Sequence, residues 1–366
     1  MTDRHSKNYL SLLDEKTVSL KRQFSGIQIP VISVFTSPES HFRMRAEFRI
    51  WHSGDKINYV MFKKGENNTP IIIQNLPNAS RTISALMTPL LKAIESQGIL
   101  SKKLFQIDFL STTTHQLLVT LLYHKKLDES WEAAASELQS QFDFSLIGRA
   151  RKQKIALNKD YVIEEMTVNN HLYQYQQVEN SFTQPNACIC EKMLNWAVDN
   201  TKNSQGDLLE LYCGNGNFTL PLSKNFKKVL ATEVSKTSVK SAHYNIELNK
   251  TDNVNIVRLS SEELTQALNK TREFRRLADI NLDDYAFSAV FVDPPRAGLD
   301  DETLKFVSQF DTIIYISCNP GTLTDNIKNL PNHTVEKLAL FDQFPFTDHI
   351  ECGAILRSAL KAQQRE

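Results

Sequence analysis

The sequence lacks any apolar run that approaches the roughly 20 residues needed to cross a membrane. Its first residues, MTDRHSKNYL, lack the apolar stretch of a secretion signal. Cysteine is scarce, with five in 366 residues, and an odd, scattered set is not typical of a disulfide framework. We therefore expect a cytoplasmic protein that does not bind membranes.

The sequence also lacks a net charge of either sign, because 42 basic residues balance 42 acidic ones. The balance hides an asymmetry: residues 1–180 carry 22 basic and 18 acidic side chains, and residues 181–366 carry 20 and 24. A mildly basic front and an acidic back fit a binding module joined to a catalytic one. We predict two domains, 1–180 and 181–366.

The first domain has the pattern of an α+β fold. Residues 1–24 are helix-like, and residues 41–52 alternate strictly between apolar and polar side chains. Period-two alternation predicts a strand whose polar face carries Arg43, Arg45, Glu47 and Arg49. Further strands are expected near 57–63, 104–110 and 116–123, with a helix over 131–142. We expect an antiparallel sheet backed by helices.

The second domain alternates strand and helix patterns. Near-continuous apolar strands of this kind predict a mainly parallel, doubly wound, Rossmann-like α/β sheet. The expected strands are 207–212, 228–233, 254–259, 286–293, 312–317, 335–341 and 352–356.

A glycine-rich turn follows the first of these strands, in LLELYCGNGNF. Gly214 and Gly216 allow a tight bend and close approach to a ligand, but Thr219 stands where a dinucleotide loop needs a third glycine. The shorter E-x-x-x-G-x-G loop resembles the S-adenosylmethionine loop of class I methyltransferases. Glu233, at the end of the next strand, suits a pair of ribose hydroxyls.

Two later strand ends carry reactive groups. Asp293 begins the motif DPPR, in which Arg296 replaces the aromatic residue typical of enzymes that methylate base amines. Cys318 follows the strand 312–317, and a helix expected to open near Thr322 should favour its thiolate. The other cysteines, Cys188, Cys190, Cys213 and Cys352, are expected to be small buried side chains, and a lone C-x-C does not predict a zinc site.

This arrangement suits methylation of C5 of uracil. A thiolate that adds to C6 makes C5 nucleophilic, and a base must later remove the C5 proton. From the residues alone, Glu351, His349 and Asp348 are all candidates for that base.

The chain resembles the RNA uracil-C5 methyltransferases, and its front half resembles their bacterial tRNA branch, which makes ribothymidine at uridine 54 of the T loop. The segments that carry the resemblance are SFTQPN (181–186), LLELYCGNGNF (208–218), FVDPPRAGLD (291–300), YISCNPGTL (315–323) and DQFPFTDHIECGAIL (342–356), with SHFRMRAEFRIWH, KLFQID and LLYHKKL in the front half.

The resemblance implies roles for individual residues. Cys318 is the nucleophile and Glu351 the base. The cofactor S-adenosyl-L-methionine is bound by Gln184, Tyr212, Asn217, Glu233 and Asp293. The T arm of tRNA is bound by Arg45, Arg49, Phe105 and His124, of which Phe105 and His124 could stack where the target base leaves the loop.

The resemblance also sets expectations about partners. The first cysteine is Cys188, so the N-terminal cysteine cluster of the ribosomal-RNA branches is absent, and we expect no iron–sulfur cluster and no metal. That absence favours tRNA, with tRNA-like RNAs such as tmRNA as further substrates, and we expect a monomer. Three alternatives remain open: a tRNA-folding helper, an rRNA methyltransferase and a small-molecule methyltransferase.

Overall fold

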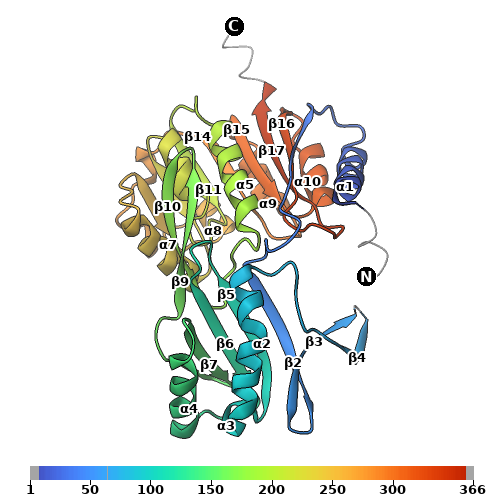
Figure 1. Cartoon of the computed structure of the whole chain (residues 1–366). Helices are drawn as coiled ribbons and strands as arrows, with labels where there is room; N and C mark the ends of the chain where they lie inside the picture. The colour runs from blue at the N-terminus through green and yellow to red at the C-terminus, as the bar shows by residue number, and fades with distance from the viewer. Residues whose placement is uncertain (1–7, 64, 360–366) are drawn as a thin grey trace. The chain divides into compact units, whose positions relative to one another are not determined.

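A computed structural model describes residues 8–63 and 65–359, which form two compact units (Figure 1). Unit 1 comprises described residues 8–37, 166–175 and 188–359, and unit 2 comprises 38–165 and 176–187. The prediction of a single division between residues 180 and 181 is therefore wrong, because each unit contains separate stretches of the chain. Strand β1 (Ile32–Phe35) pairs in parallel with β16 (His333–Phe341), which places the start of the chain in the C-terminal unit.

Unit 1 contains an eight-stranded sheet with the order β1-β16-β17-β15-β14-β11-β12-β13. The remaining strands are β11 (Asp207–Leu211), β12 (Val229–Thr232), β13 (Val254–Val257), β14 (Phe287–Val292), β15 (Thr312–Ser317) and β17 (Glu351–Ser358). All neighbours are parallel except β17, which runs antiparallel to β15 and β16. The strand order reverses between β11 and β14, and doubly wound folds bind ligands at such a switch point.

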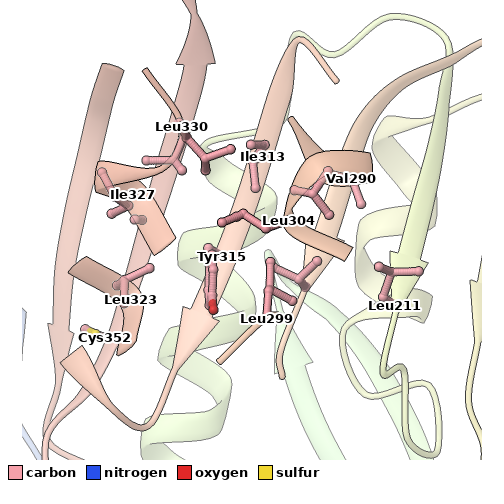
Figure 2. Packing of buried hydrophobic residues seen from close by; sticks show 14 of the residues in the cluster. Leu211, Val290, Leu299, Leu304, Ile313, Tyr315, Leu323, Ile327, Leu330 and Cys352 are labelled. Atoms are coloured by element: carbon pink, nitrogen blue, oxygen red, sulfur yellow. The ribbon is translucent and has the colours of Figure 1, made fainter. Parts of the chain in front are cut away.

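Helices cover both faces of this sheet because the strands bury side chains on both sides. On one face, the core includes residues of α1 (Tyr9–Gln23), α8 (Ser261–Leu268), α9 (Asp301–Val307) and α10 (Pro320–Lys328). Figure 2 shows part of this core, with Leu304, Leu323 and Ile327 close to Ile313 and Tyr315. On the other face, Trp196 of α5 (Ala187–Asp199) packs edge-on against Phe341. The predicted doubly wound α/β fold is confirmed.

The helix predicted over residues 1–24 is observed as α1, and residues 1–7 of that prediction lie outside the described residues. Asn8 caps α1 by accepting a hydrogen bond from the Leu10 N–H. Among the described residues, no helix is both long and apolar enough to cross a membrane.

Unit 2 contains a seven-stranded sheet with the order β4-β3-β2-β5-β6-β7-β8. Its strands are β2 (Arg45–Ser53), β3 (Lys56–Lys63), β4 (Glu66–Ile72), β5 (Leu104–Ser111), β6 (Leu117–Tyr123), β7 (Ser145–Ala150) and β8 (Gln153–Ala156). The predicted antiparallel arrangement holds except between β6 and β7, which are parallel. Helix α4 (Glu129–Ser140) lies between β6 and β7 in the chain, and this crossover lets β7 run in the same direction as β6.

One face of the unit 2 sheet is apolar and the other is polar. Phe48 of β2, Ile107 of β5 and Val119 of β6 share a core with α2 (Arg81–Ser96), α3 (Gly98–Ser101) and α4. Along β2 the alternate residues Glu47 and Arg49 are exposed, as the alternating sequence predicts. A hairpin of β9 (Tyr161–Val168) and β10 (His171–Val178) forms a separate two-stranded sheet.

Candidate active site

The glycine-rich turn after β11 has the backbone conformation that the sequence predicts. Gly214 and Gly216 adopt positive φ angles of 57° and 84°, and Tyr212 also has a positive φ of 61°. A Cβ atom at Gly214 would meet no other atom within 4 Å, so the turn is open on that side. Positive φ costs a bulky residue such as tyrosine free energy, and strained conformations of this kind cluster at functional sites.

The Glu233 carboxylate lies against this turn. The Gly214 N–H donates a hydrogen bond to its Oε2 atom at 3.0 Å, and the Ser235 N–H donates to Oε1 at 2.7 Å. The end of β12 is thereby connected to the turn after β11, and the carboxylate is held in place at the switch point.

Two buried side chains that the sequence analysis did not single out for function support Asn217. The Tyr175 hydroxyl donates to the Asn217 carbonyl at 3.0 Å, and the Asn217 Nδ2 lies 3.3 Å from the Cys190 sulfur. Cys190 was predicted only as a small buried side chain, and it is buried. Its contact with Asn217 could not have been anticipated, since β10 and α5 meet the turn only in the folded chain.

Glu210 is the acidic residue of the E-x-x-x-G-x-G motif, and it lies inside β11. Only 1% of its surface is exposed, and its Oε2 atom has no hydrogen-bond partner among the described residues. Burial raises the pKa of Glu210 to about 8, the nearby Thr219 hydroxyl opposes this shift, and the charge of Asp293 adds to it. Glu210 marks the loop in the sequence motif, but the motif alone predicted no site role for it.

Asp293 directly follows β14, the strand next to β11 across the switch point. The residue is half-buried, and burial of its carboxyl group raises its pKa to about 7. Asp293 and Glu351 interact electrostatically, and each favours the neutral form of the other.

Strand register brings Cys318 and Glu351 together. The antiparallel pairing of β15 with β17 ends where Ser317 faces Cys352, so Cys318 directly follows this last pair on one segment and Glu351 directly precedes it on the other. The two groups are near enough for the charge of Glu351 to act on the Cys318 thiol. Cys318 is half-buried and free, whereas Glu351 is buried.

Both loops beside this pair are braced. The Asn319 side chain accepts from the Gly321 N–H at 3.1 Å and caps α10, and its Nδ2 donates to the Arg296 carbonyl at 3.0 Å. The helix opens at Pro320, two residues before the predicted Thr322.

The ionisation expected for Cys318 is not what the structure favours. Burial raises the pKa of its thiol, and the charges of Glu351 and Asp293 raise it further, while Arg296 opposes them. The prediction that the helix N-terminus makes the thiolate the favoured form is therefore wrong, because burial and acidic neighbours outweigh it.

Burial separates the three candidate bases. Asp348 and His349 are exposed on the loop before β17, whereas Glu351 is 4% exposed and its pKa is raised well above the ordinary value by burial and by Asp293. Of the three, Glu351 is the one that directly precedes Cys352, the residue paired with Ser317 next to Cys318.

The predicted RNA contacts lie in unit 2, where three of the four residues form one stack. The Arg49 guanidinium lies over the Phe105 ring at 4.0 Å, and Phe105 stacks on His124 with centroids 4.1 Å apart. Arg45 is half-buried on the same polar face of β2. The predicted cofactor residue Gln184 also belongs to unit 2, where it is half-buried.

The same polar face carries acidic groups. Burial raises the pKa of Asp108 to about 6, with Glu47 and Glu179 adding to the shift and Arg45 opposing it. Among residues 8–63 and 65–359, no three or more His, Cys, Asp or Glu side chains cluster so as to hold a metal ion.

Comparison with known proteins agrees with this geometry. The family described as tRNA (Uracil-5-)-methyltransferase matches residues 8–359. A protein of Saccharophagus degradans named tRNA/tmRNA (uracil-C(5))-methyltransferase is 56% identical over 351 residues, covering 95% of this chain and 96% of its own. A Neisseria meningitidis protein of the same name is 52% identical over 364 residues, covering 98% and 99%.

The fold also matches a solved structure. The tRNA (uracil-54, C5)-methyltransferase of Pyrococcus abyssi, in complex with S-adenosyl-L-homocysteine, superimposes with a TM-score of 0.73 at 22% identity. The match covers 95% of this chain and 83% of that one. The resemblance inferred from the sequence is confirmed, and the chain belongs to the tRNA (uracil-5-)-methyltransferase family.

Proposed function

We propose that this protein methylates C5 of uridine 54 in the T loop of tRNA, and also acts on tmRNA, with S-adenosyl-L-methionine as methyl donor. The observation that carries the proposal is that the end of β15 and the start of β17 bring Cys318 near Glu351 and Asp293, whose charges act on the Cys318 thiol. Relatives named for tRNA and tmRNA support the substrates, and the archaeal enzyme named for uracil 54 supports the position. We propose that the protein works as a monomer in the cytoplasm.

The glycine-rich site fits this cofactor. The open side of Gly214 leaves room for a ligand backbone, and the unpartnered Glu210 Oε2 suits a positively charged amine. The anchored Glu233 carboxylate can accept from two ribose hydroxyls. We assign cofactor binding to Gln184, Tyr212, Asn217, Glu233 and Asp293, with Glu210 added.

S-adenosyl-L-methionine supplies a methyl group on a positively charged sulfur, which a carbon nucleophile can attack. The Cys318 thiol first gives up its proton to water, and the thiolate then bonds to C6 of the uracil while the electrons of the C5–C6 double bond move onto C5 and O4. C5 takes the methyl group as the bond between that methyl carbon and the donor sulfur breaks, which leaves S-adenosyl-L-homocysteine, and C5 now carries both the methyl group and its hydrogen.

Glu351 completes the reaction. Its carboxylate removes the C5 proton, the C5–C6 double bond re-forms, and the C6–S bond breaks to release Cys318 as thiolate. Burial of Glu351 suits this task, because a raised pKa makes its carboxylate a stronger base than an exposed glutamate.

The polar face of unit 2 supplies binding. Arg49, Phe105 and His124 present a continuous stack of planar groups, a surface on which unpaired bases can lie. Arg45 adds positive charge for phosphate on the same face.

A trapping experiment tests the proposed function. A T-arm hairpin with 5-fluorouridine at position 54, incubated with the protein and S-adenosyl-L-methionine, should form a covalent complex that survives denaturing electrophoresis, because fluorine cannot leave as a proton. The complex should be lost in Cys318→Ala and kept in Cys188→Ala, a matched change at another half-buried free cysteine. No complex with the unchanged protein, or a complex that persists in Cys318→Ala, would contradict the proposal.

A further inference from the structure

Helix α1 carries a lysine on its buried face. The buried residues Tyr9, Leu12, Leu13, Lys16 and Leu20 follow helical spacing, so position 16 lies where the pattern requires an apolar side chain. Lysine is almost never fully buried unless it is paired. Lys16 therefore has a specific partner, and that partner shows what the helix holds.

The partner lies 326 residues away, at the start of the loop that joins β16 to β17. The Lys16 Nζ donates to the Asp342 Oδ1 at 2.6 Å and to the Phe344 carbonyl at 2.8 Å. The two charged side chains are 6% and 1% exposed. Apolar residues of similar size often stabilise a fold as well as a buried ion pair does, so stability alone is a weak reason for this pair.

The contact continues along the loop toward Glu351. The Phe344 carbonyl that Lys16 holds also accepts from the Thr347 hydroxyl at 2.8 Å, and that hydroxyl accepts from the His349 N–H at 3.3 Å. Glu351 follows two residues later as the first residue of β17. Hydrogen bonds thus connect Lys16 to the segment that leads into Glu351.

A second contact holds the same loop. The ring of Tyr9, also on the buried face of α1, packs against Phe346 with centroids 5.8 Å apart. Phe346 adopts a positive φ of 61°, a conformation that costs a bulky residue free energy and persists only when its surroundings enforce it.

Helix α1 also contacts α10, the helix that follows Cys318, and Figure 1 shows the two side by side. Leu13 of α1 and Leu323 of α10 belong to one core cluster. Helix α1 therefore contacts both the helix that follows Cys318 and the loop that precedes Glu351.

We infer that Lys16 is a positioning residue that holds the 342–350 loop so that Glu351 reaches the C5 proton. This inference rests on the proposed function and assigns a task to a helix distant in sequence from the site. Without the Lys16 contacts, the loop gains freedom on the side of the base. Removal of the C5 proton and release of Cys318 should slow more than formation of the C6–S bond.

The test follows both steps in single-turnover reactions with an unmodified T-arm hairpin and S-adenosyl-L-methionine. In Lys16→Met, a methylated covalent complex should accumulate, with release slowed about tenfold or more, because small misplacements of catalytic groups cost large factors in rate. Adduct formation should change by no more than about threefold, because the Lys16 hydrogen bonds go to Asp342 and Phe344, in the loop that leads to Glu351, so the position of Cys318 changes less. Lys21→Met, at an exposed lysine of the same helix, should behave like the unchanged protein.

Two further variants separate position from stability and from the proposed function. Lys16→Met leaves Asp342 buried and unpaired, so the double variant Lys16→Met/Asp342→Asn should regain thermal stability but still release product slowly. Equal slowing of both steps in Lys16→Met, or normal release in the double variant, would overturn the inference. Glu351→Gln serves as the positive control: if it accumulates no complex, the proposed function fails, independently of Lys16.

Discussion

The two units place their functional side chains in different surroundings. In unit 1, burial raises the pKa values of Glu210, which lies inside β11, and of Asp293 and Glu351, which lie at strand ends. In unit 2, the polar face of β2 exposes Arg49, and the stack of Arg49, Phe105 and His124 contains no buried carboxylate. In unit 1, burial changes the proton affinity of a few carboxyl groups, whereas in unit 2 the exposed stack provides a surface on which a ligand can lie.

This comparison predicts that chemistry and binding can be separated by mutation, and the largest effect is expected at Cys318. Cys318→Ala removes the nucleophile, so methyl transfer should fall by at least about 10⁴-fold, since no other group can activate C5. Affinity for tRNA should stay within about threefold, because rim and stacking contacts in unit 2 are untouched. Methyl incorporation measures the loss of transfer, and a filter-binding titration measures the affinity for tRNA. A loss of tRNA affinity as large as the loss of methyl transfer would show that chemistry and binding are not separable at Cys318.

A second prediction concerns the cost of burying Glu210. Its pKa is about 8 in the folded chain and 4.5 ordinarily, so between these values the folded state holds a proton that the unfolded state has lost. Stability should therefore fall as pH rises through this window, by at most about 5 kcal/mol from this residue. Thermal unfolding of the cofactor-free protein should show a shallower fall in Glu210→Gln. An unchanged pH dependence would show that Glu210 ionises normally.

The third prediction tests the exposed stack. Phe105→Ala should weaken tRNA binding about tenfold, since base stacking on an aromatic side chain contributes about 1–3 kcal/mol. The rate of methyl transfer at saturating tRNA should be little changed. The matched control is Lys92→Ala, which changes a side chain of α2 on the opposite side of the sheet. Thr113→Ala is not a suitable control, because the Thr113 hydroxyl donates a hydrogen bond to the Glu165 carbonyl. Equal effects of the two substitutions would remove the stack from the RNA-binding surface.

The smallest effect is expected behind the cofactor turn. Tyr175→Phe removes one buried hydroxyl that donates to the Asn217 carbonyl, and a hydrogen bond of this kind contributes about 1 kcal/mol. The KM for S-adenosyl-L-methionine should rise a few-fold, while the KM for tRNA stays constant. A rise in the tRNA value alone would show that Tyr175 does not act through the cofactor turn.

Local patterns predicted much of the fold. Runs of apolar residues bounded by polar ones located every strand of the eight-stranded sheet except β1. The alternation of apolar and polar side chains assigned the two faces of β2. Strand β1 was missed because four residues gain their strand character only by pairing with β16, some 300 residues later. A division of the chain at 180 failed for the same reason.

The site was predicted unevenly. Cys318 could be chosen among five cysteines because it follows a strand. From the residues alone Glu351 could not be separated from Asp348 and His349; the family resemblance selected it, and burial distinguishes it in the folded chain. The ionisation of Cys318 was mispredicted, since a helix N-terminus is visible in a sequence and the burial of a thiol is not. The role of Lys16 was not predicted, because its partner is remote in sequence.

The central claim is that Cys318 and Glu351 act on the same uracil as nucleophile and base. It is tested most directly with tRNA tritiated at C5 of uridine 54, by following methyl transfer and tritium release together in Glu351→Gln. The account predicts that this variant transfers the methyl group, remains covalently attached to the RNA and retains the tritium. Release of tritium at the rate of the unchanged protein would show that another residue removes the proton and would contradict the account.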